Sequence, residues 1–261
     1  MSFSENRPPL FRDIRRLEWL IARPVAHRGL HDATRGIIEN TPSAVTAAVA
    51  GGYGIEVDLQ ITADGEAMVH HDDALGRLTD GTGNLASMST AALKQVPFKA
   101  TTDRMITLGE LCDMVAGRVT LVLELKSRFD GDPRLVARAA DVLKIYAGPV
   151  AVMSFDPVQV AAMRATAPAL VRGIVAERWY THHEWERLSP SERRNLAFLL
   201  HGWHTRPHFV AYSVRDLPAL APLLARNLFG RPLLTWTVRT TEDRMRAQRW
   251  TDQMIFEGFR A

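Results

Sequence analysis

The 261-residue sequence contains a single cysteine, Cys112, so it can form no intrachain disulfide and no zinc site built from cysteine and histidine. It has no run of the roughly 18 apolar residues that a membrane span needs, and its N-terminus lacks the apolar segment of a secretory signal. Lys and Arg (32) are spread along the chain and little exceed Asp and Glu (29), which disfavours a nucleic-acid partner. We expect a soluble, cytoplasmic protein without stable membrane insertion, whose net charge of +3 suits a small anionic substrate.

The order of short patterns along the chain indicates the fold. Apolar residues make up 46% of the sequence and charged residues 23%, as in ordinary globular proteins. Short β-rich segments alternate with helical patterns, and eight such units predict an α/β protein with a TIM (β/α)8 barrel. No Gly-x-Gly-x-x-Gly follows the first strand to favour an open dinucleotide-binding sheet. The predicted strands are Pro24–Arg28, Gly54–Thr62, Val119–Lys126, Val150–Phe155, Val171–Ala176, Phe209–Val214, Leu233–Val238 and Met254–Phe256.

We interpret residues 1–261 as one barrel domain with two additions. Residues 1–23 have the pattern of a short amphipathic helix, which would close the bottom of the barrel or, alternatively, lie on a membrane surface. Residues 177–208 lack strand character and are expected to form a lid or side wall. Their five histidines suggest a second metal site as an alternative, but we favour solvated or hydrogen-bonded loop histidines. The histidines are His182, His183, His201, His204 and His208.

Acidic residues on two predicted strands offer ligands for a cation. Glu56 and Asp58 are two positions apart on one strand and therefore share a face. Glu124 lies near the end of the next barrel strand, two positions before Lys126, with which it could instead form a buried ion pair. Three carboxylates together suit one hard divalent cation, Mg²⁺ or Ca²⁺, better than zinc.

A β-hairpin extension is expected directly after the second strand. Asp64-Gly65 is a strong turn signal, and the chain is too short here for a parallel crossover, so Ala67–His71 should pair antiparallel. With Asp64 and Gly65 as a two-residue turn, Asp58 faces His71 and His70 points away. A slip of one residue would exchange the two histidines.

A second candidate histidine, His27, follows the first predicted strand at its C-terminal end. Barrel enzymes place their chemistry at this end of the strands. Arg28 beside it has the planar fork that binds phosphate or carboxylate. Two histidines near a divalent cation, with Arg28 and Lys126 close by, indicate acid–base chemistry on a phosphate ester.

The ordered set of these motifs resembles the glycerophosphodiester phosphodiesterase family, which is similar in architecture to phosphoinositide-specific phospholipase C. Each motif alone is weak, whereas their order along most of the chain is specific. One departure lies after the last strand, where Phe256-Glu257-Gly258-Phe259 replaces the family's Thr-Asp-x-Pro, and Glu257 could take part in that rim or merely cap it. The matching motifs are His27-Arg28-Gly29, Glu39-Asn40-Thr41, Glu56-Val57-Asp58, Thr62-Ala63-Asp64-Gly65, His71-Asp72, Glu124-Leu125-Lys126, Ser154-Phe155 and Trp236-Thr237-Val238.

The resemblance implies a metal-dependent enzyme of glycerol and lipid metabolism that hydrolyses glycerophosphodiesters to sn-glycerol 3-phosphate and an alcohol. It implies His27 and His71 as the catalytic acid–base pair, with a cyclic phosphate as one possible intermediate. The remaining roles it implies are metal binding by Glu56, Asp58 and Glu124, phosphate binding by Arg28 and Lys126, and pocket lining by Asn40 and Trp236.

Two other functions stay open at this point. One is a lysophospholipase D type activity on lysophospholipids, which an apolar groove formed by Trp179, Trp185 and Trp203 would favour. The other is a barrel that binds phosphate or lipid without catalysis, against which the complete set of histidines and carboxylates argues. The sequence does not identify the alcohol group, the metal or the oligomeric state.

Overall fold

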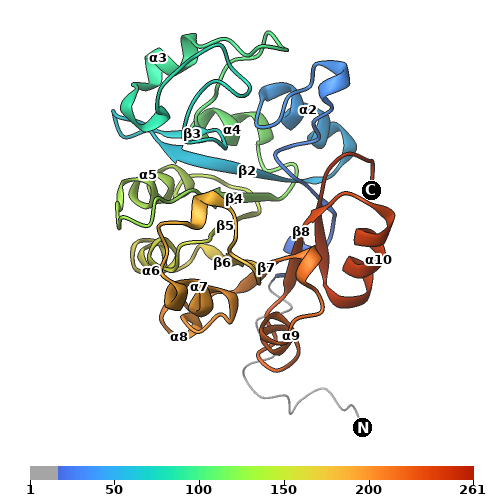
Figure 1. Ribbon diagram of the computed structural model, residues 1–261. Coiled ribbons are helices and arrows are strands. Elements are labelled where there is room, and N and C mark those ends of the chain that lie inside the picture. The colour runs from blue at the N-terminus through green and yellow to red at the C-terminus, as the bar shows by residue number, and fades with distance from the viewer. Residues whose placement is uncertain (1–16) are drawn as a thin grey trace.

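The computed structural model describes residues 17–261, which form a closed ring of eight parallel strands (Figure 1). The strands follow one another in the order β1-β9-β8-β7-β6-β5-β4-β2, and pairing of β1 with β2 closes the ring. The predicted TIM barrel is therefore confirmed. The strands are β1 Val25–Ala26, β2 Gly54–Ile61, β4 Leu121–Leu125, β5 Val150–Ser154, β6 Val171–Ala176, β7 Phe209–Ser213, β8 Leu233–Val238 and β9 Gln253–Phe256.

Helices surround the strands on the outside of the ring (Figure 1). Their ends follow the capping signals of the sequence, because Thr41 accepts a hydrogen bond from the first turn of α2 and Gly52 ends that helix in the left-handed conformation. The helices are α1 Glu18–Ile21, α2 Pro42–Gly51, α3 Thr90–Gln95, α4 Leu108–Val115, α5 Arg134–Leu143, α6 Pro157–Thr166, α7 Pro190–Ala197, α8 Gly202–Thr205, α9 Leu220–Asn227 and α10 Thr241–Trp250. Four short 3-10 helices are η3 Ala33–Arg35, η4 Leu85–Ser87, η5 His183–Trp185 and η6 Val214–Asp216.

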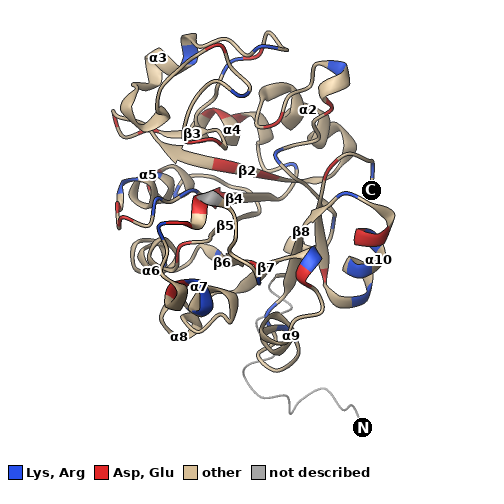
Figure 2. Cartoon of the chain, viewed as in Figure 1, with Lys and Arg blue, Asp and Glu red and all other residues tan. Residues whose placement is uncertain are grey.

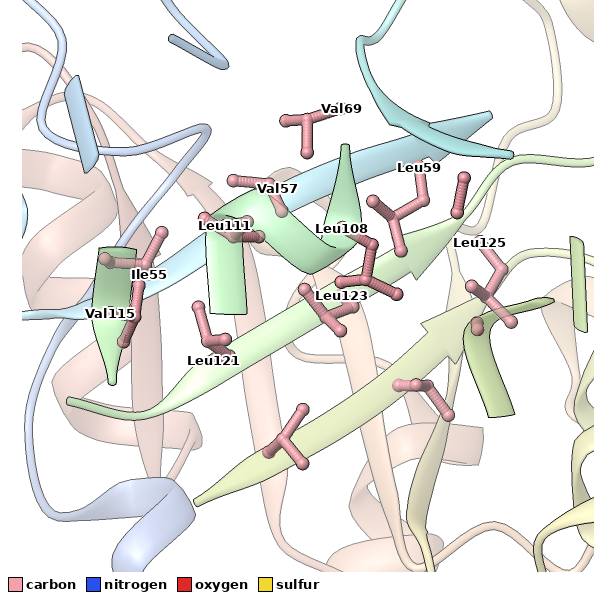
Figure 3. Packing of buried hydrophobic residues seen from close by; sticks show 14 of the residues in the cluster. Ile55, Val57, Leu59, Val69, Leu108, Leu111, Val115, Leu121, Leu123 and Leu125 are labelled. Atoms are coloured by element: carbon pink, nitrogen blue, oxygen red, sulfur yellow. The ribbon is translucent and has the colours of Figure 1, made fainter. Parts of the chain in front are cut away.

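Side-chain alternation along β2 and β4 decides which residues face the inside of the ring. Ile55, Val57 and Leu59 point outwards and form one buried cluster with Leu121, Leu123 and Leu125, in which Leu108, Leu111 and Val115 of α4 take part (Figure 3). Val122 belongs instead to the second cluster, inside the ring, with residues such as Val25, Ala151, Phe209 and Leu234. Since neighbours along a strand face opposite sides, Glu56, Asp58 and Glu124 must face inwards as well.

The hairpin extension is present, but its predicted register is wrong by one residue. Strand β3, Ala67–Val69, pairs antiparallel with β2, with Gln60 opposite Met68 rather than Val69. The turn holds three residues instead of two, because the Thr62 amide donates to the carbonyl of Glu66 and Gly65 adopts a left-handed φ of 83°. A three-residue loop with a left-handed glycine adds one residue relative to the Asp-Gly turn and shifts the ladder accordingly.

The two additions to the barrel differ in how far they can be described. Residues 1–16 of the predicted N-terminal helical segment lie outside the described residues. The part that is described includes α1, whose Leu20 is fully buried against the cluster inside the ring. Residues 177–208, between β6 and β7, contain η5, α7 and α8 and no strand. No helix among residues 17–261 is long and apolar enough to cross a membrane.

Candidate active site

A cavity of about 780 Å³ opens where the barrel strands end. Barrel enzymes bind their substrates at this C-terminal end of the strands. Asp58 and Asn40 do not line the cavity but reach it indirectly, because Asp58 contacts two lining residues and Asn40 bonds Asp58. The other residues that the sequence indicated all line it, namely His27, Arg28, Glu56, His71, Glu124, Lys126 and Trp236.

The three carboxylates of β2 and β4 converge inside the ring. Each of Glu56, Asp58 and Glu124 offers an oxygen within 4.8 Å of the others, and all three side chains are buried. They meet because Asp58 and Glu124 are direct neighbours in the parallel ladder, while Glu56 precedes Asp58 on the same face. Figure 2 shows this acidic stretch of β2 crossing the molecule among largely uncharged strands.

Two cations frame these carboxylates. Lys126 Nζ lies 3.1 Å from Asp58 Oδ1 and 2.8 Å from Glu124 Oε1. Arg28 Nε lies 3.2 Å from Asp58 Oδ2. Burial alone would raise the pKa of Asp58. The positive charges of Lys126 and Arg28 outweigh burial and hold this pKa well below its usual value. Asp58 is therefore ionised across the ordinary pH range.

Glu56 is in the opposite electrostatic situation. Burial, together with repulsion from Asp58 and Glu124, raises the pKa of Glu56 well above its usual value. Its Oε2 accepts a hydrogen bond of 3.0 Å from the Arg28 amide, whereas its buried Oε1 has no partner among the described residues. An orphaned buried carboxylate oxygen is costly, and a cation between the three acids would supply its missing partner.

The donor set fits a hard divalent ion. It consists of carboxylate oxygens only, which Mg²⁺ and Ca²⁺ prefer. Among the described residues one further group of metal-ligating atoms lies within 4.8 Å, formed by His27, His31 and Glu257. Neither group contains a histidine of residues 177–208.

The backbone at the site is held in an unusual conformation. Arg28 and Asn40 have φ values of 55° and 57°, in the left-handed region that side chains other than glycine rarely adopt. The Asn40 amide donates to the Arg28 carbonyl at 2.9 Å, and Asn40 Nδ2 donates to Asp58 Oδ2 at 2.9 Å. Such conformations cost on the order of 1–3 kcal/mol each and are typical of functional sites. Asn40 thus holds the Asp58 carboxylate in place and contacts the cavity only through it.

The two candidate histidines come from different elements and have different partners. His27 follows β1, and its Nδ1 lies 2.5 Å from Glu257 Oε2, while its Nε2 lies 3.9 Å from Glu56. Burial is the main cause that lowers the pKa of His27, and Glu257 opposes it. His71 follows β3, lines the cavity and pairs through Nδ1 with Asp72 at 2.8 Å.

His70 is buried and does not line the cavity. In the observed register His70, not His71, continues the ladder opposite Asp58, and its amide donates to the Asp58 carbonyl. His71 nevertheless reaches the cavity because β3 ends at Val69, so strand alternation does not govern the residues that follow. His71 therefore lies at the cavity as expected, although the register from which this was inferred is wrong.

Several residues of the site were not among the sequence candidates for a role. Glu39 and Asp72 are joined by Arg77, which connects the Arg28 side of the cavity to the His71 side. The motifs named above contain Glu39 and Asp72, but no spacing rule reveals that Arg77 joins them. Glu257 was considered as part of the rim or as a cap, without a partner.

Aromatic side chains form the wall opposite the acidic cluster. Phe155 packs against Trp185 at 4.9 Å and against Trp236 at 5.3 Å between ring centroids, and all three line the cavity. Residues 177–208 supply part of this wall through His182, Glu184, Trp185 and Arg187. Trp179 and Trp203 are exposed and do not line the cavity, so the three tryptophans of this segment do not form one apolar groove.

The closed parallel barrel combines buried carboxylates, two cationic side chains and two histidines at the C-terminal ends of its strands, an arrangement that fits a TIM-barrel phosphodiesterase. The model of the glycerophosphoryl diester phosphodiesterase family matches residues 27–259. The chain belongs to this family and is an enzyme that hydrolyses phosphodiesters.

Individual relatives agree with this assignment. A glycerophosphodiester phosphodiesterase of Caldanaerobacter subterraneus is 27% identical over 234 residues, covering 84% of this chain and 86% of the relative. The bovine glycerophosphodiester phosphodiesterase 1 is 29% identical over 171 residues, 61% of this chain and 50% of its own length, so the match spans half of that relative.

Solved structures share the fold. An Oleispira antarctica phosphodiesterase in complex with the product sn-glycerol-3-phosphate superposes with a TM-score of 0.73 at 21% identity, covering 89% of this chain and 91% of its own. A putative glycerophosphoryl diester phosphodiesterase of Silicibacter pomeroyi gives a TM-score of 0.72 at 24% identity, covering 92% of both chains.

Proposed function

We propose that this enzyme hydrolyses glycerophosphodiesters to sn-glycerol 3-phosphate and an alcohol, with one divalent cation held by Glu56, Asp58 and Glu124. The observation that carries the proposal is the buried acidic cluster with an unpartnered Glu56 oxygen, directly beside Lys126 and Arg28. The Oleispira antarctica phosphodiesterase contains sn-glycerol-3-phosphate as its product, which supports the same product here.

The cation, Mg²⁺ or Ca²⁺, would lower the pKa of a bound hydroxyl and neutralise charge that develops on the phosphate. It would also neutralise the carboxylates that Arg28 and Lys126 now pair with, so their N–H groups can donate to the phosphate oxygens. A guanidinium and an ammonium on one phosphate provide both orientation and charge. These two residues therefore fix the phosphorus between the histidines.

The two histidines act through their Nε2 atoms, because both Nδ1 atoms are held by carboxylates. In the first step one histidine removes the proton of the glycerol 2-hydroxyl as its oxygen attacks phosphorus. The other histidine gives a proton to the departing alcohol oxygen, leaving a 1,2-cyclic phosphate. In the second step the roles reverse, and water opens the ring to glycerol 3-phosphate.

We further propose that residues 1–261 act as one barrel domain and that residues 177–208 serve as a side wall of the site. The lysophospholipase D alternative would be favoured by an apolar groove of three tryptophans. Trp179 and Trp203 do not line the cavity with Trp185, so this support is missing.

Turnover of glycerophosphocholine and of lysophosphatidylcholine, with and without EDTA, tests the proposal. We expect release of glycerol 3-phosphate from the first substrate only, and loss of this activity in EDTA. Faster cleavage of lysophosphatidylcholine would favour the lipid activity instead. Binding of both compounds without any turnover in added Mg²⁺ or Ca²⁺ would favour a non-catalytic barrel.

A further inference from the structure

Glu177 is a buried carboxylate in the cavity that the catalytic proposal does not use. It directly follows β6, lines the cavity, and is 8% exposed. Its Oε1 has no hydrogen-bond partner, and no described Lys, Arg or His forms an ion pair with this side chain. The Trp185 indole is close enough to lower the pKa of Glu177, but no countercharge compensates this buried carboxylate. That arrangement is unfavourable, so the group lacks a cationic partner that a ligand could provide.

The surroundings of Glu177 are aromatic and acidic. Its amide donates to Tyr180 Oη, and Tyr180 packs against Trp185 at 5.1 Å between centroids. Phe155 lies 4.9 Å from Trp185 and lines the same cavity. Glu184 and Asp216 repel the Glu177 carboxylate rather than neutralise it. Aromatic faces beside an uncompensated carboxylate are the chemistry that recognises an organic ammonium group.

Two arginines of the cavity rim are directed to other partners. Arg239 pairs with Glu257, and Arg187 Nη1 donates to the Arg128 carbonyl at 2.8 Å. Arg215 is exposed at the rim and makes no ion pair with Glu177 among the described residues. Burial raises the pKa of Glu177 to about 7, so above this pH its negative charge is available to a ligand.

Glu177 lies where the alcohol group of a bound diester would be expected. In the observed strand order β6 lies directly across the ring from β1, which carries His27 and Arg28. Glycerol must lie beside the histidines and the acidic cluster if its 2-hydroxyl is to react. A diester with its phosphate at Arg28 and Lys126 would then extend its alcohol group towards β6.

We propose that Glu177, Phe155 and Trp185 form a subsite for a positively charged alcohol group of the substrate, an ammonium or trimethylammonium, with Glu177 as its countercharge. This inference rests on the proposed function and specifies its substrate class. Diesters with neutral alcohols, such as glycerol or inositol, would gain no charge interaction there.

A pair of substrates that differ only in charge tests the subsite. Glycerophosphocholine is compared with the diester of 3,3-dimethylbutanol, in which carbon replaces the quaternary nitrogen. We expect kcat/KM to be about tenfold higher for the choline diester, mainly through a lower KM, as for a cation held between aromatic faces and a carboxylate. In Glu177→Gln the two substrates should become nearly equal. Glu186→Gln, which removes an exposed charge outside the cavity, should keep the wild-type preference.

Three outcomes would overturn the subsite. The first is an equal kcat/KM of the wild-type enzyme for the two diesters. The second is that Glu177→Gln lowers kcat/KM for both diesters by the same factor. The third is that Glu186→Gln also loses the preference for the choline diester. If neither diester is hydrolysed, the proposed function fails, but binding still tests the subsite. Quenching of tryptophan fluorescence should then show tighter binding of choline than of 3,3-dimethylbutanol, and Glu177→Gln should abolish the difference. Equal quenching by both would reject it.

Discussion

His27 Nδ1 and Glu257 Oε2 lie 2.5 Å apart, so one hydrogen bond joins the residue after the first barrel strand to the residue after the last. Burial alone would raise the pKa of Glu257, but the hydrogen bond from His27, together with the nearby His31 ring and Arg239, holds this pKa far below its usual value. Glu257 is therefore an acceptor, and Nδ1 of His27 must carry the proton. This leaves the lone pair of Nε2 free to take a proton from substrate.

Replacing Glu257 by Gln should slow catalysis without removing a group that touches substrate. The amide accepts a hydrogen bond but supplies no negative charge to a protonated His27, so we expect kcat to fall about 10- to 100-fold. Because Glu257 raises the pKa of His27, its loss should move the His27 limb of the pH–rate profile to lower pH. The profile of kcat/KM measures this, with Glu242→Gln, an exposed acid on α10, as control. An unchanged profile would mean that Glu257 only packs the closure of the ring.

Much of the barrel could be predicted because its information is local. Each strand is a short apolar run followed by a helical pattern, and β6 and β8 have the predicted bounds. The hairpin register could not be predicted, since Asp64-Gly65 is compatible with loops of two or three residues. The contact of Glu257 with His27 could not be predicted, because these residues come from opposite ends of the chain and only the closed ring brings them together. Glu177 was missed although Tyr180 and Trp185 are close in sequence, because no spacing rule indicates how a segment without strand character folds over the cavity.

His71 and His70 should differ strongly in catalysis although they are adjacent. His71→Ala removes an acid–base group that lines the cavity, so kcat should fall by about 10²-fold or more. His70→Gln changes a buried side chain outside the lining, so it should lower the melting temperature while kcat changes little. Steady-state rates and thermal unfolding of both variants are compared at a temperature where both are folded. The reverse ranking of rates would show that the wrong histidine has been assigned.

Removing the metal and removing a ligand should have separate signatures. EDTA should abolish turnover, and Mg²⁺ or Ca²⁺ should restore it. Glu56→Gln relieves repulsion with Asp58 and Glu124, so the metal-free variant should melt at a higher temperature than metal-free wild type. Added metal should stabilise wild type more than the variant, because an amide is a poorer ligand. Full activity in a metal-stripped sample, or equal stabilisation of both proteins, would contradict the assignment.

The stability of the ligand-free protein should depend on pH through Glu177. Burial raises the pKa of Glu177 to about 7, and Asp216 and Glu184 add to the effect. Between the unfolded pKa near 4.3 and pH 7 the folded state binds more protons than the unfolded state, so stability falls as pH rises, by up to about 3 kcal/mol. The Glu177→Gln variant has no carboxyl group at this position, so its stability does not fall with pH for this reason. Urea unfolding should therefore find the variant close to wild type at pH 4.5 and more stable at pH 8, and equal pH dependence would reject the shift.

The last prediction separates two possible nucleophiles. His27 and His71 follow separate strands, β1 and β3, so they can serve opposite sides of one phosphorus as base and acid. No serine or cysteine belongs to the assigned catalytic set, so the attacking oxygen comes from the glycerol 2-hydroxyl or from water. An attack within the substrate gains the advantage of proximity, which commonly amounts to several powers of ten. A 2-deoxy glycerophosphodiester should therefore be hydrolysed at least about 10³-fold more slowly than the natural substrate, although it binds with a similar Kd. With the natural substrate, rapid-quench ³¹P NMR should detect a 1,2-cyclic phosphate. Equal rates for the two substrates would instead identify water as the nucleophile, with the same histidines moving its protons.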